Sequence, residues 1–233
     1  TTSTNTQGDI DSTVQVDPSG GFSIVKYTGT LSSSGVQTIG HGLSKAPSMF
    51  ITKSLEKTGN WWVFSDFQTS WNYGINLNTT GASTDKSGNG SMSAPTSTVF
   101  STNYTDGLNE NGNDLIAYCF ANIEGYCKVG SYVGNAATDG PFVYTGFRPA
   151  FVMNKPLVAG NWRLVDSQRS PYNVTQNALS PNNADAKDTY ASVNIDLLSN
   201  GFKMRNSGTP MNQATTYVYL AFAENPFKYA TAR

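Results

Sequence analysis

The chain repeats itself once, and this repeat limits the possible folds more than any other feature of the sequence. The tripeptide Gly59-Asn60-Trp61 returns as Gly160-Asn161-Trp162. An apolar segment that begins with Pro and ends with Lys precedes each tripeptide, at residues 47–53 and at residues 149–155. The offset is about 102 residues, and two further pairs recur in the same order: residues 27–30 with 132–135, and residues 118–122 with 220–224. Four collinear matches at nearly constant spacing predict a duplicated unit of about 100 residues.

Each unit is expected to be all-β. Leu, Glu, Lys and Ala do not accumulate in any long amphipathic stretch, whereas the chain has 12 Tyr, 12 Phe and 22 Gly. Short apolar runs separated by clusters of Gly, Asn, Ser and Pro are typical of strands joined by turns. The expected strands are residues 22–27, 49–53, 61–66, 115–122, 142–145, 150–155, 193–197 and 216–223. We therefore expect two tandem pseudo-repeats, each a β-sandwich or a barrel-like unit.

The repeat also predicts the domain organisation. Residues 1–20 are expected to form a Ser/Thr-rich extended linker, residues 21–125 the first β unit and residues 126–233 the second. A short connector at residues 123–129 favours packing of the two units as a pseudo-symmetric pair. Residues 167–188, which contain two prolines, are expected to be an exposed excursion with at most one helical turn.

The charge pattern excludes several classes of protein. Only 13% of the residues are charged and the formal net charge is −1, so no basic field attracts the phosphates of a nucleic acid. No apolar run approaches the roughly 20 residues of a membrane-spanning helix, and no segment resembles a signal peptide. Cys119 and Cys127 are too few and too close together for a disulfide framework, which indicates reduced thiols and synthesis in a cytoplasm.

Neither nucleophilic catalysis nor zinc binding is supported by the residues. His41 is the single histidine and lies in the turn-rich segment Gly40-His41-Gly42-Leu43. No serine or cysteine stands in a recognisable nucleophile motif, and one His with two Cys matches no zinc-ligand spacing. We expect His41 to hydrogen-bond local backbone.

Carboxylates offer a weaker case for catalysis or metal binding. Asp66 and Asp166 each close a Trp-led strand and could in principle form a glycosidase pair. We expect them at equivalent positions in the two units, which favours a shared structural task, such as capping a turn. Asp9, Asp11 and Asp17 depart from the twelve-residue calcium-loop pattern, and a solvated linker is the stronger interpretation. We expect no catalytic residue, no cofactor and no metal site.

Aromatic side chains are the most suggestive candidates for ligand binding. Trp61 and Trp62 are adjacent in an expected strand, so one should enter the core while the other faces solvent or a neighbouring surface. Trp71, Tyr73 and Tyr104 lie in or near expected loops. Exposed rings beside Asn and Asp are typical of sugar-binding surfaces, because the ring stacks on C–H groups and the amides bind hydroxyls. The candidate ligand-binding residues are Trp62, Trp71, Tyr73 and Tyr104, although most aromatics in such a protein belong to the core or to subunit contacts.

Five sequence blocks resemble a β-rich domain family found at the C-terminal end of fibre and appendage proteins of tailed phages, commonly marine phages and cyanophages. The resemblance spans roughly residues 20–233. Its most specific part is the closing Ala-Glu-Asn-Pro-Phe block, at residues 223–227. The other blocks are residues 21–29, 40–43, 46–47 and 139–150, and the closing match as a whole covers residues 221–229.

The resemblance implies a structural protein of the virion, made in the host cytoplasm and carried in a tail fibre, spike or appendage. The chain is then the terminal part of a longer virion protein. Such proteins are often homotrimers that contact other virion proteins, and a receptor-binding role in host attachment through a surface glycan follows. No catalytic residue is carried over, and the expected function is non-enzymatic. Two alternatives stay open: a purely architectural capsid-decoration or fibre-capping module, and a polysaccharide depolymerase.

Overall fold

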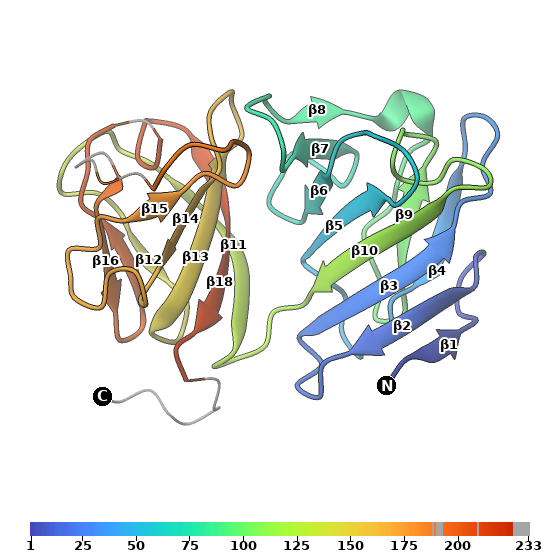
Figure 1. Ribbon diagram of the computed structural model, residues 1–233, viewed down its shortest axis with the longest axis horizontal. Helices are drawn as coiled ribbons and strands as arrows, with labels where there is room; N and C mark the ends of the chain where they lie inside the picture. Colours follow the sequence, from blue (N-terminus) through green and yellow to red (C-terminus); the bar gives the residue numbers. More distant parts are fainter. Residues whose placement is uncertain (188, 190–192, 209, 226–233) are drawn as a thin grey trace. The chain divides into compact units, whose positions relative to one another are not determined.

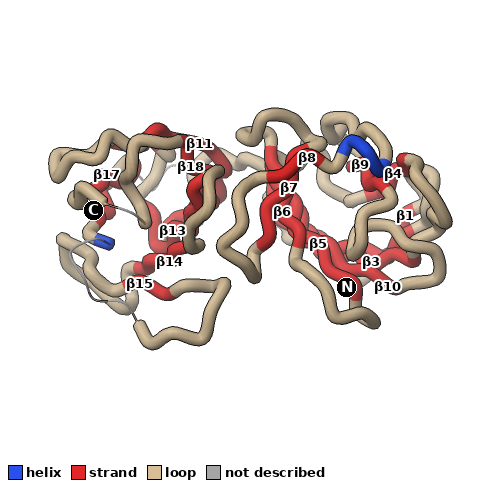
Figure 2. Tube along the Cα trace, turned by 90° about the horizontal axis from the view of Figure 1, so that it is seen from above, coloured by secondary structure: helices blue, strands red, loops and turns tan. Residues whose placement is uncertain are grey.

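The computed structural model describes residues 1–187, 189, 193–208 and 210–225. This part of the chain is nearly all β, with antiparallel strands (Figures 1 and 2). Two compact units divide it: unit 1 comprises Thr1–Leu77 and Ser83–Asn122, and unit 2 comprises Asn78–Ala82 and Ile123–Arg233. The change from the first unit to the second falls close to the expected boundary at residue 125.

Unit 1 packs a large sheet against a small one. The large sheet has the strand order β1-β2-β3-β10-β5-β6-β7-β8, and β4 pairs with β9 in the small sheet. Val25 and Phe50 from the large sheet meet Ile39 and Phe100 from the small sheet in one buried cluster, which makes the unit a sandwich. The strands are β1 (Ser3–Asn5), β2 (Ser12–Val16), β3 (Phe22–Thr28), β4 (Val36–Gly40), β5 (Met49–Ser54), β6 (Trp62–Ser65), β7 (Tyr73–Asn76), β8 (Thr84–Asp85), β9 (Val99–Asn103) and β10 (Asp114–Phe120), with a 3-10 turn, η1 (Ser87–Asn89), after β8.

Unit 2 is built in the same way. Its larger sheet has the order β11-β18-β13-β14-β15, and its smaller sheet has the order β12-β17-β16. Val152 and Tyr219 from the larger sheet meet Val143 and Phe202 from the smaller sheet in the buried cluster. The strands are β11 (Cys127–Val133), β12 (Phe142–Tyr144), β13 (Pro149–Pro156), β14 (Arg163–Asp166), β15 (Ala178–Leu179), β16 (Ile195–Leu198), β17 (Gly201–Met204) and β18 (Thr216–Ala223).

The strand orders of the two units correspond. The series β3-β10-β5-β6-β7 in unit 1 matches β11-β18-β13-β14-β15 in unit 2, and the pair β4-β9 matches β12-β17. The registers agree as well, because Phe50 lies opposite Phe64 while Val152 lies opposite Val165. Unit 1 differs by carrying β1 and β2 beyond β3 and β8 beyond β7, and unit 2 by carrying β16 beside β17. The shared topology supports a single module that was copied within the chain.

The prediction that residues 1–20 form an extended linker is wrong. Residues 3–5 and 12–16 form β1 and β2, and β2 pairs with β3 along its whole length. Ile10 and Val14 are buried in the core of unit 1. Their Ser- and Thr-rich context concealed an alternating pattern in which every second residue of β2 faces inward.

All eight segments expected as strands overlap strands of the structure. The expected connector at residues 123–129 contains a tight turn, in which the N–H of Ile123 donates to the carbonyl of Cys127, and then the start of β11. The expected excursion at residues 167–188 contains β15 and the highly exposed Tyr172, and residue 188 lies outside the described residues. No helix among the described residues is long and apolar enough to cross a membrane.

Candidate functional site

A buried asparagine occupies corresponding positions in the two units, in the turn before the last strand of each larger sheet. Asn109 precedes β10 and Asn212 precedes β18, and both are fully buried. The Oδ1 atom of Asn109 accepts a hydrogen bond from the N–H of Thr30 at 2.9 Å. The Oδ1 atom of Asn212 accepts one from the N–H of Asn135, also at 2.9 Å. These anchor asparagines tie the loop after β3 or β11 to the turn before the last strand.

A buried tyrosine bonds the backbone next to each anchor asparagine. The Tyr27 hydroxyl donates to the carbonyl of Leu108 at 2.6 Å, and the Tyr132 hydroxyl donates to the carbonyl of Met211 at 2.8 Å. Leu108 and Met211 are the residues directly before the anchors. Burial raises the pKa of both phenols, so they stay neutral donors across the physiological range.

The same contact explains two glycines of the repeated segments. A Cβ on Gly29 would lie 2.2 Å from the carbonyl oxygen of Glu110, and a Cβ on Gly134 would lie 2.1 Å from that of Gln213. Any side chain at either position would therefore push the loop away from the turn. The echo of Tyr27-Thr28-Gly29 in Tyr132-Val133-Gly134 thus records a loop-holding device that both units use.

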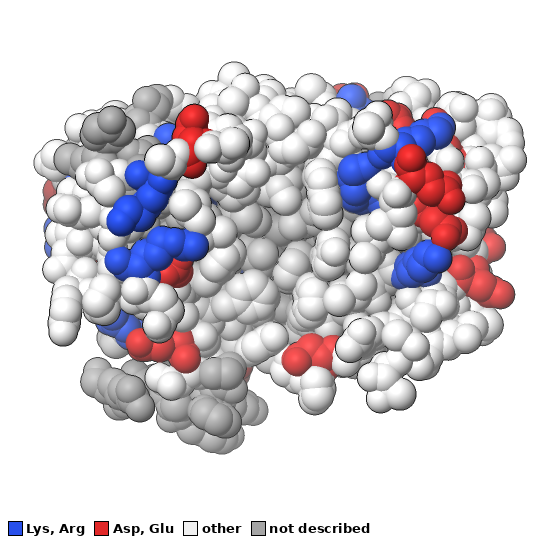
Figure 3. All heavy atoms as spheres, in the orientation of Figure 1, with Lys and Arg blue, Asp and Glu red and all other residues white. Residues whose placement is uncertain are grey.

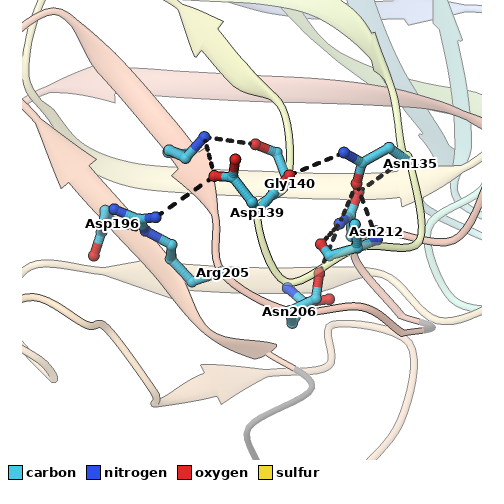
Figure 4. Close-up of polar contacts among 9 residues, drawn as sticks. Asn135, Asp139, Gly140, Asp196, Arg205, Asn206 and Asn212 are labelled. Atoms are coloured by element: carbon cyan, nitrogen blue, oxygen red, sulfur yellow. Dashed lines mark hydrogen bonds and ion pairs between the residues drawn. The ribbon is translucent and has the colours of Figure 1, made fainter.

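In unit 2 the anchor fixes the loop between β11 and β12 (Figure 4). The Nδ2 atom of Asn212 donates to Asn135 Oδ1 at 3.0 Å, to the carbonyl of Ala137 at 2.8 Å and to the carbonyl of Asn206 at 2.6 Å. Asn135 in turn donates from Nδ2 to the carbonyl of Asp139 at 3.0 Å. Residues 135–140 are consequently held against the scaffold although they lie outside any strand.

This loop carries an exposed carboxylate over two cations (Figure 4). Asp139 lies 2.9 Å from Lys203 Nζ and 3.9 Å from an Arg205 nitrogen, with its side chain 86% exposed. Its hydrogen bond with Lys203 lowers the pKa of Asp139. Arg205 also pairs with Asp196 at 2.5 Å. The two carboxylates and two cations leave this group of side chains without net charge. Figure 3 shows that acidic and basic side chains also lie side by side in small groups on the face drawn there.

In unit 1, the turn before β10 that holds Asn109 also carries a pair of carboxylates, Asp106 and Glu110. The pKa of Asp106 is raised, first by partial burial and then by the nearby Glu110. Lys57 Nζ lies 3.0 Å from Glu110 Oε2, and the pKa of Lys57 is raised chiefly by that hydrogen bond. The Nε1 atom of Trp62 donates to the carbonyl of Asp106 at 2.8 Å, so the turn rests on the indole.

The four candidate ligand-binding residues do not gather on one exposed surface. Trp62 and Trp71 are buried in the core of unit 1, and the Lys86 ammonium lies 4.7 Å above the Trp62 ring. Tyr73 on β7 and Tyr104 after β9 are half-buried. Trp62 and Tyr104 both lie close to the Asp106 turn, because Trp62 bonds its backbone and Tyr104 contributes to the electrostatic environment of Lys57.

The expected split between the two adjacent tryptophans is confirmed. Trp62 enters the core, whereas Trp61 is half-buried and stacks on Tyr118, with ring centroids 6.3 Å apart. Neither buried tryptophan presents a ring face to solvent, so the aromatic sugar platform expected from Trp62 and Trp71 is absent.

The reactive side chains are used for structure. His41 is fully buried, with Nδ1 accepting from the N–H of Leu43 at 3.1 Å and Nε2 lying 3.2 Å from the carbonyl of Thr96. The prediction of local backbone bonding is confirmed, and burial lowers the pKa of the ring. Burial also raises the pKa of the thiols of Cys119 and Cys127 to about 12, which leaves them protonated and unreactive at neutral pH.

Asp66 and Asp166 do not occupy equivalent positions. In unit 2, Asp166 pairs with Phe151. The counterpart of Phe151 in unit 1 is Met49, and Met49 pairs with Ser65 rather than with Asp66. The two aspartates are therefore offset by one residue. Asp166 caps a turn, because its Oδ1 accepts from the N–H groups of Gln168 and Arg169.

The acidic residues near the N-terminus bond the protein itself. Asp9 accepts from the N–H and the hydroxyl of Thr38 at 2.9 and 2.8 Å, and these bonds lower its pKa. Asp17 accepts from the N–H of Ser19 at 2.9 Å. Among the described residues, no group of three or more His, Cys, Asp or Glu side chains could hold a metal ion.

The anchor asparagines were missed by sequence reasoning. Asn109 lies in an Asn- and Gly-rich turn and Asn212 in a turn with little similarity to it, so only one shared residue type links them. The available signal was the similar distance of each asparagine from the repeated Tyr-x-Gly segment, since Asn109 follows Tyr27 by 82 residues and Asn212 follows Tyr132 by 80.

A family model described as "Domain of unknown function (DUF7483)" matches residues 1–226. The chain therefore belongs to this family. No curated protein and no solved structure matches the chain.

Proposed function

We propose that this chain is a non-enzymatic module of a tailed-phage virion appendage, such as a fibre or spike, that contributes to attachment to a bacterial surface glycan. The observation that carries the proposal is the pair of anchored loops. In each unit a buried asparagine, a buried tyrosine and a glycine together fix a polar, solvent-exposed loop. Rigid polar loops on a β scaffold suit recognition, because their ordering cost is met in folding rather than on binding.

The treatment of reactive groups supports the non-enzymatic part of the proposal. The single histidine is buried between backbone groups, and both thiols are buried and protonated. The low charge also suits binding to a neutral surface, because hydrogen bonds to hydroxyls are less sensitive to salt than ion pairs are.

The test is binding of the purified chain to intact host cells before and after periodate oxidation of their surface sugars. The proposal expects saturable binding that oxidation abolishes. Equal binding to oxidised cells would assign attachment to a protein or lipid receptor. Absence of binding to either kind of cell would contradict the proposal.

A purely architectural role is the second candidate, and β12 favours it. This strand is at the edge of its sheet, and it exposes Phe142 and Tyr144, which are 44% and 65% exposed. Unpaired edge strands with apolar side chains are prone to associate with another chain. An architectural module would form homo-oligomers, a trimer among them, and would not bind cells. Light scattering on the isolated chain together with the cell-binding assay separates the two roles.

A further inference from the structure

At the β3 edge of its large sheet, unit 1 carries two strands, β1 and β2, that have no counterpart among the described residues of unit 2. β2 pairs with β3, and β1 pairs with β2, so together they widen the large sheet beyond β3 (Figure 1). In unit 2 the corresponding strand, β11, is the last of its sheet. The inward residues of β2 complete the core, whereas its outward residues add a new surface.

The register of these strands brings polar side chains together on the outward face. Thr4 lies opposite Thr13, and Thr13 lies opposite Lys26. Asp11 precedes Thr13 by two residues and Thr28 follows Lys26 by two, so both fall on the same face in the next row. All five side chains are exposed and line a depression of about 200 Å³, here called the β1–β3 depression.

Two side chains that line this depression, Lys26 and Thr28, already bond to Asp114. Lys26 Nζ lies 2.7 Å from one carboxylate oxygen of Asp114, and the Thr28 hydroxyl donates to the other at 2.7 Å. The side chains of Thr4, Asp11 and Thr13 make no hydrogen bond to the described residues. The depression therefore combines a fixed floor with one carboxylate and two hydroxyls that are free to bind a ligand.

This set of groups matches the chemistry of a sugar. A carboxylate accepts hydrogen bonds from two neighbouring hydroxyls at once, and threonine hydroxyls both donate and accept. Asp11 and Asp114 outnumber Lys26 by one negative charge, which disfavours an acidic polysaccharide. The shape is open, so it suits a stretch of polymer lying along the sheet.

We propose that the β1–β3 depression binds the hydroxyl groups of a neutral polysaccharide, with Asp11 as the principal acceptor. The inference rests on the proposed function, since it names the glycan class and the surface that contacts it. It also accounts for β1 and β2, because four of the residues that line the depression come from these strands and the segment joining them.

The experiment measures binding of the whole chain to immobilised bacterial polysaccharides, neutral and acidic, followed by amide chemical-shift mapping with the strongest neutral one. Asp11→Asn keeps the size of the side chain and removes its charge, and we expect at least about a tenfold loss of affinity. Asp66→Asn is the matched control, because Asp66 is an exposed carboxylate of unit 1 outside the depression. Its affinity should equal that of the unaltered chain, and shifts should map to residues 4, 11–13 and 26–28.

Three results would overturn the inference while leaving glycan attachment intact: unchanged affinity in Asp11→Asn, shifts confined to the turn at residues 104–110, or a preference for acidic polysaccharides. Failure of the unaltered chain to bind any polysaccharide would instead overturn glycan attachment itself, and the inference with it.

Discussion

Gly130 on β11 lies directly opposite Tyr219 on β18, and the tyrosine ring occupies the space that a side chain at residue 130 would need. A Cβ on Gly130 would lie 2.5 Å from the Tyr219 hydroxyl oxygen. The corresponding pair in unit 1 is Val25 opposite Ala117. The two copies of the module have therefore exchanged a large and a small residue across the same pair of strands, which keeps both cores filled.

This exchange predicts a double-mutant cycle. Gly130→Val should destabilise the chain by about 1–3 kcal/mol through overpacking, and Tyr219→Ala by about 3–5 kcal/mol through the cavity it leaves. The double variant should cost less than the sum by about 1–3 kcal/mol, because valine fills part of that cavity. Urea unfolding measures all three values, and strict additivity would show that the two positions do not share space.

The anchor asparagines predict a second effect on stability. Asn212→Ala removes four hydrogen bonds of a buried side chain and should cost about 3 kcal/mol, with faster amide exchange across residues 135–140. Asn111→Ala is the control, since Asn111 is exposed and its side chain has no partner among the described residues; it should change stability by less than about 0.5 kcal/mol. Unchanged exchange in Asn212→Ala would show that other contacts hold the loop.

Lys155 predicts a pH dependence of stability. Its side chain is fully buried, donates to the carbonyls of Gly81, Pro156 and Val158 and, within the described residues, faces no carboxylate. Desolvation lowers its pKa to about 8 from an ordinary 10.5. Between these values the unfolded chain binds more protons than the folded one, so the contribution of Lys155 to stability rises with pH, by about 3 kcal/mol in total.

Comparison with Lys155→Met isolates this contribution, because buried tyrosines and cysteines, which act in the opposite direction above about pH 9, are common to both chains. The stability of the unaltered chain relative to the variant should increase from about pH 8 to about pH 10. Lys155→Arg serves if the methionine variant does not fold, since arginine keeps its charge throughout. A difference that is flat across this range would mean that the ammonium is solvated.

The two thiols predict selective chemical protection. Cys119 and Cys127 are almost completely buried, and each has a pKa of about 12. Neither should react with a soluble disulfide reagent in the folded chain near neutral pH, and both should react at once in urea. Stoichiometric labelling of the folded protein would contradict their placement in the sheets.

The sequence was sufficient for the duplication and the all-β class, because matched segments such as Gly59-Asn60-Trp61 and Gly160-Asn161-Trp162 lie on corresponding strands or turns. It was insufficient for β1 and β2, whose polar residues face solvent and hide the inward alternation of Ser12 and Val14. The sequence also did not predict the pairing register to within one residue, because Asp66 and Asp166 differ by one position in the two units. The prediction that Trp62 and Trp71 bind a ligand was wrong because a tryptophan in a strand or nearby loop fits a core as well as a surface.

Glycan attachment is tested most directly by competition between the soluble chain and whole phage for adsorption to host cells. Increasing concentrations of the unaltered chain should reduce the fraction of phage adsorbed, and Asp66→Asn should reduce it equally. Asp11→Asn should need at least about tenfold more protein for the same effect. Undiminished adsorption at concentrations of the unaltered chain that saturate its binding to immobilised polysaccharide would contradict a role in attachment.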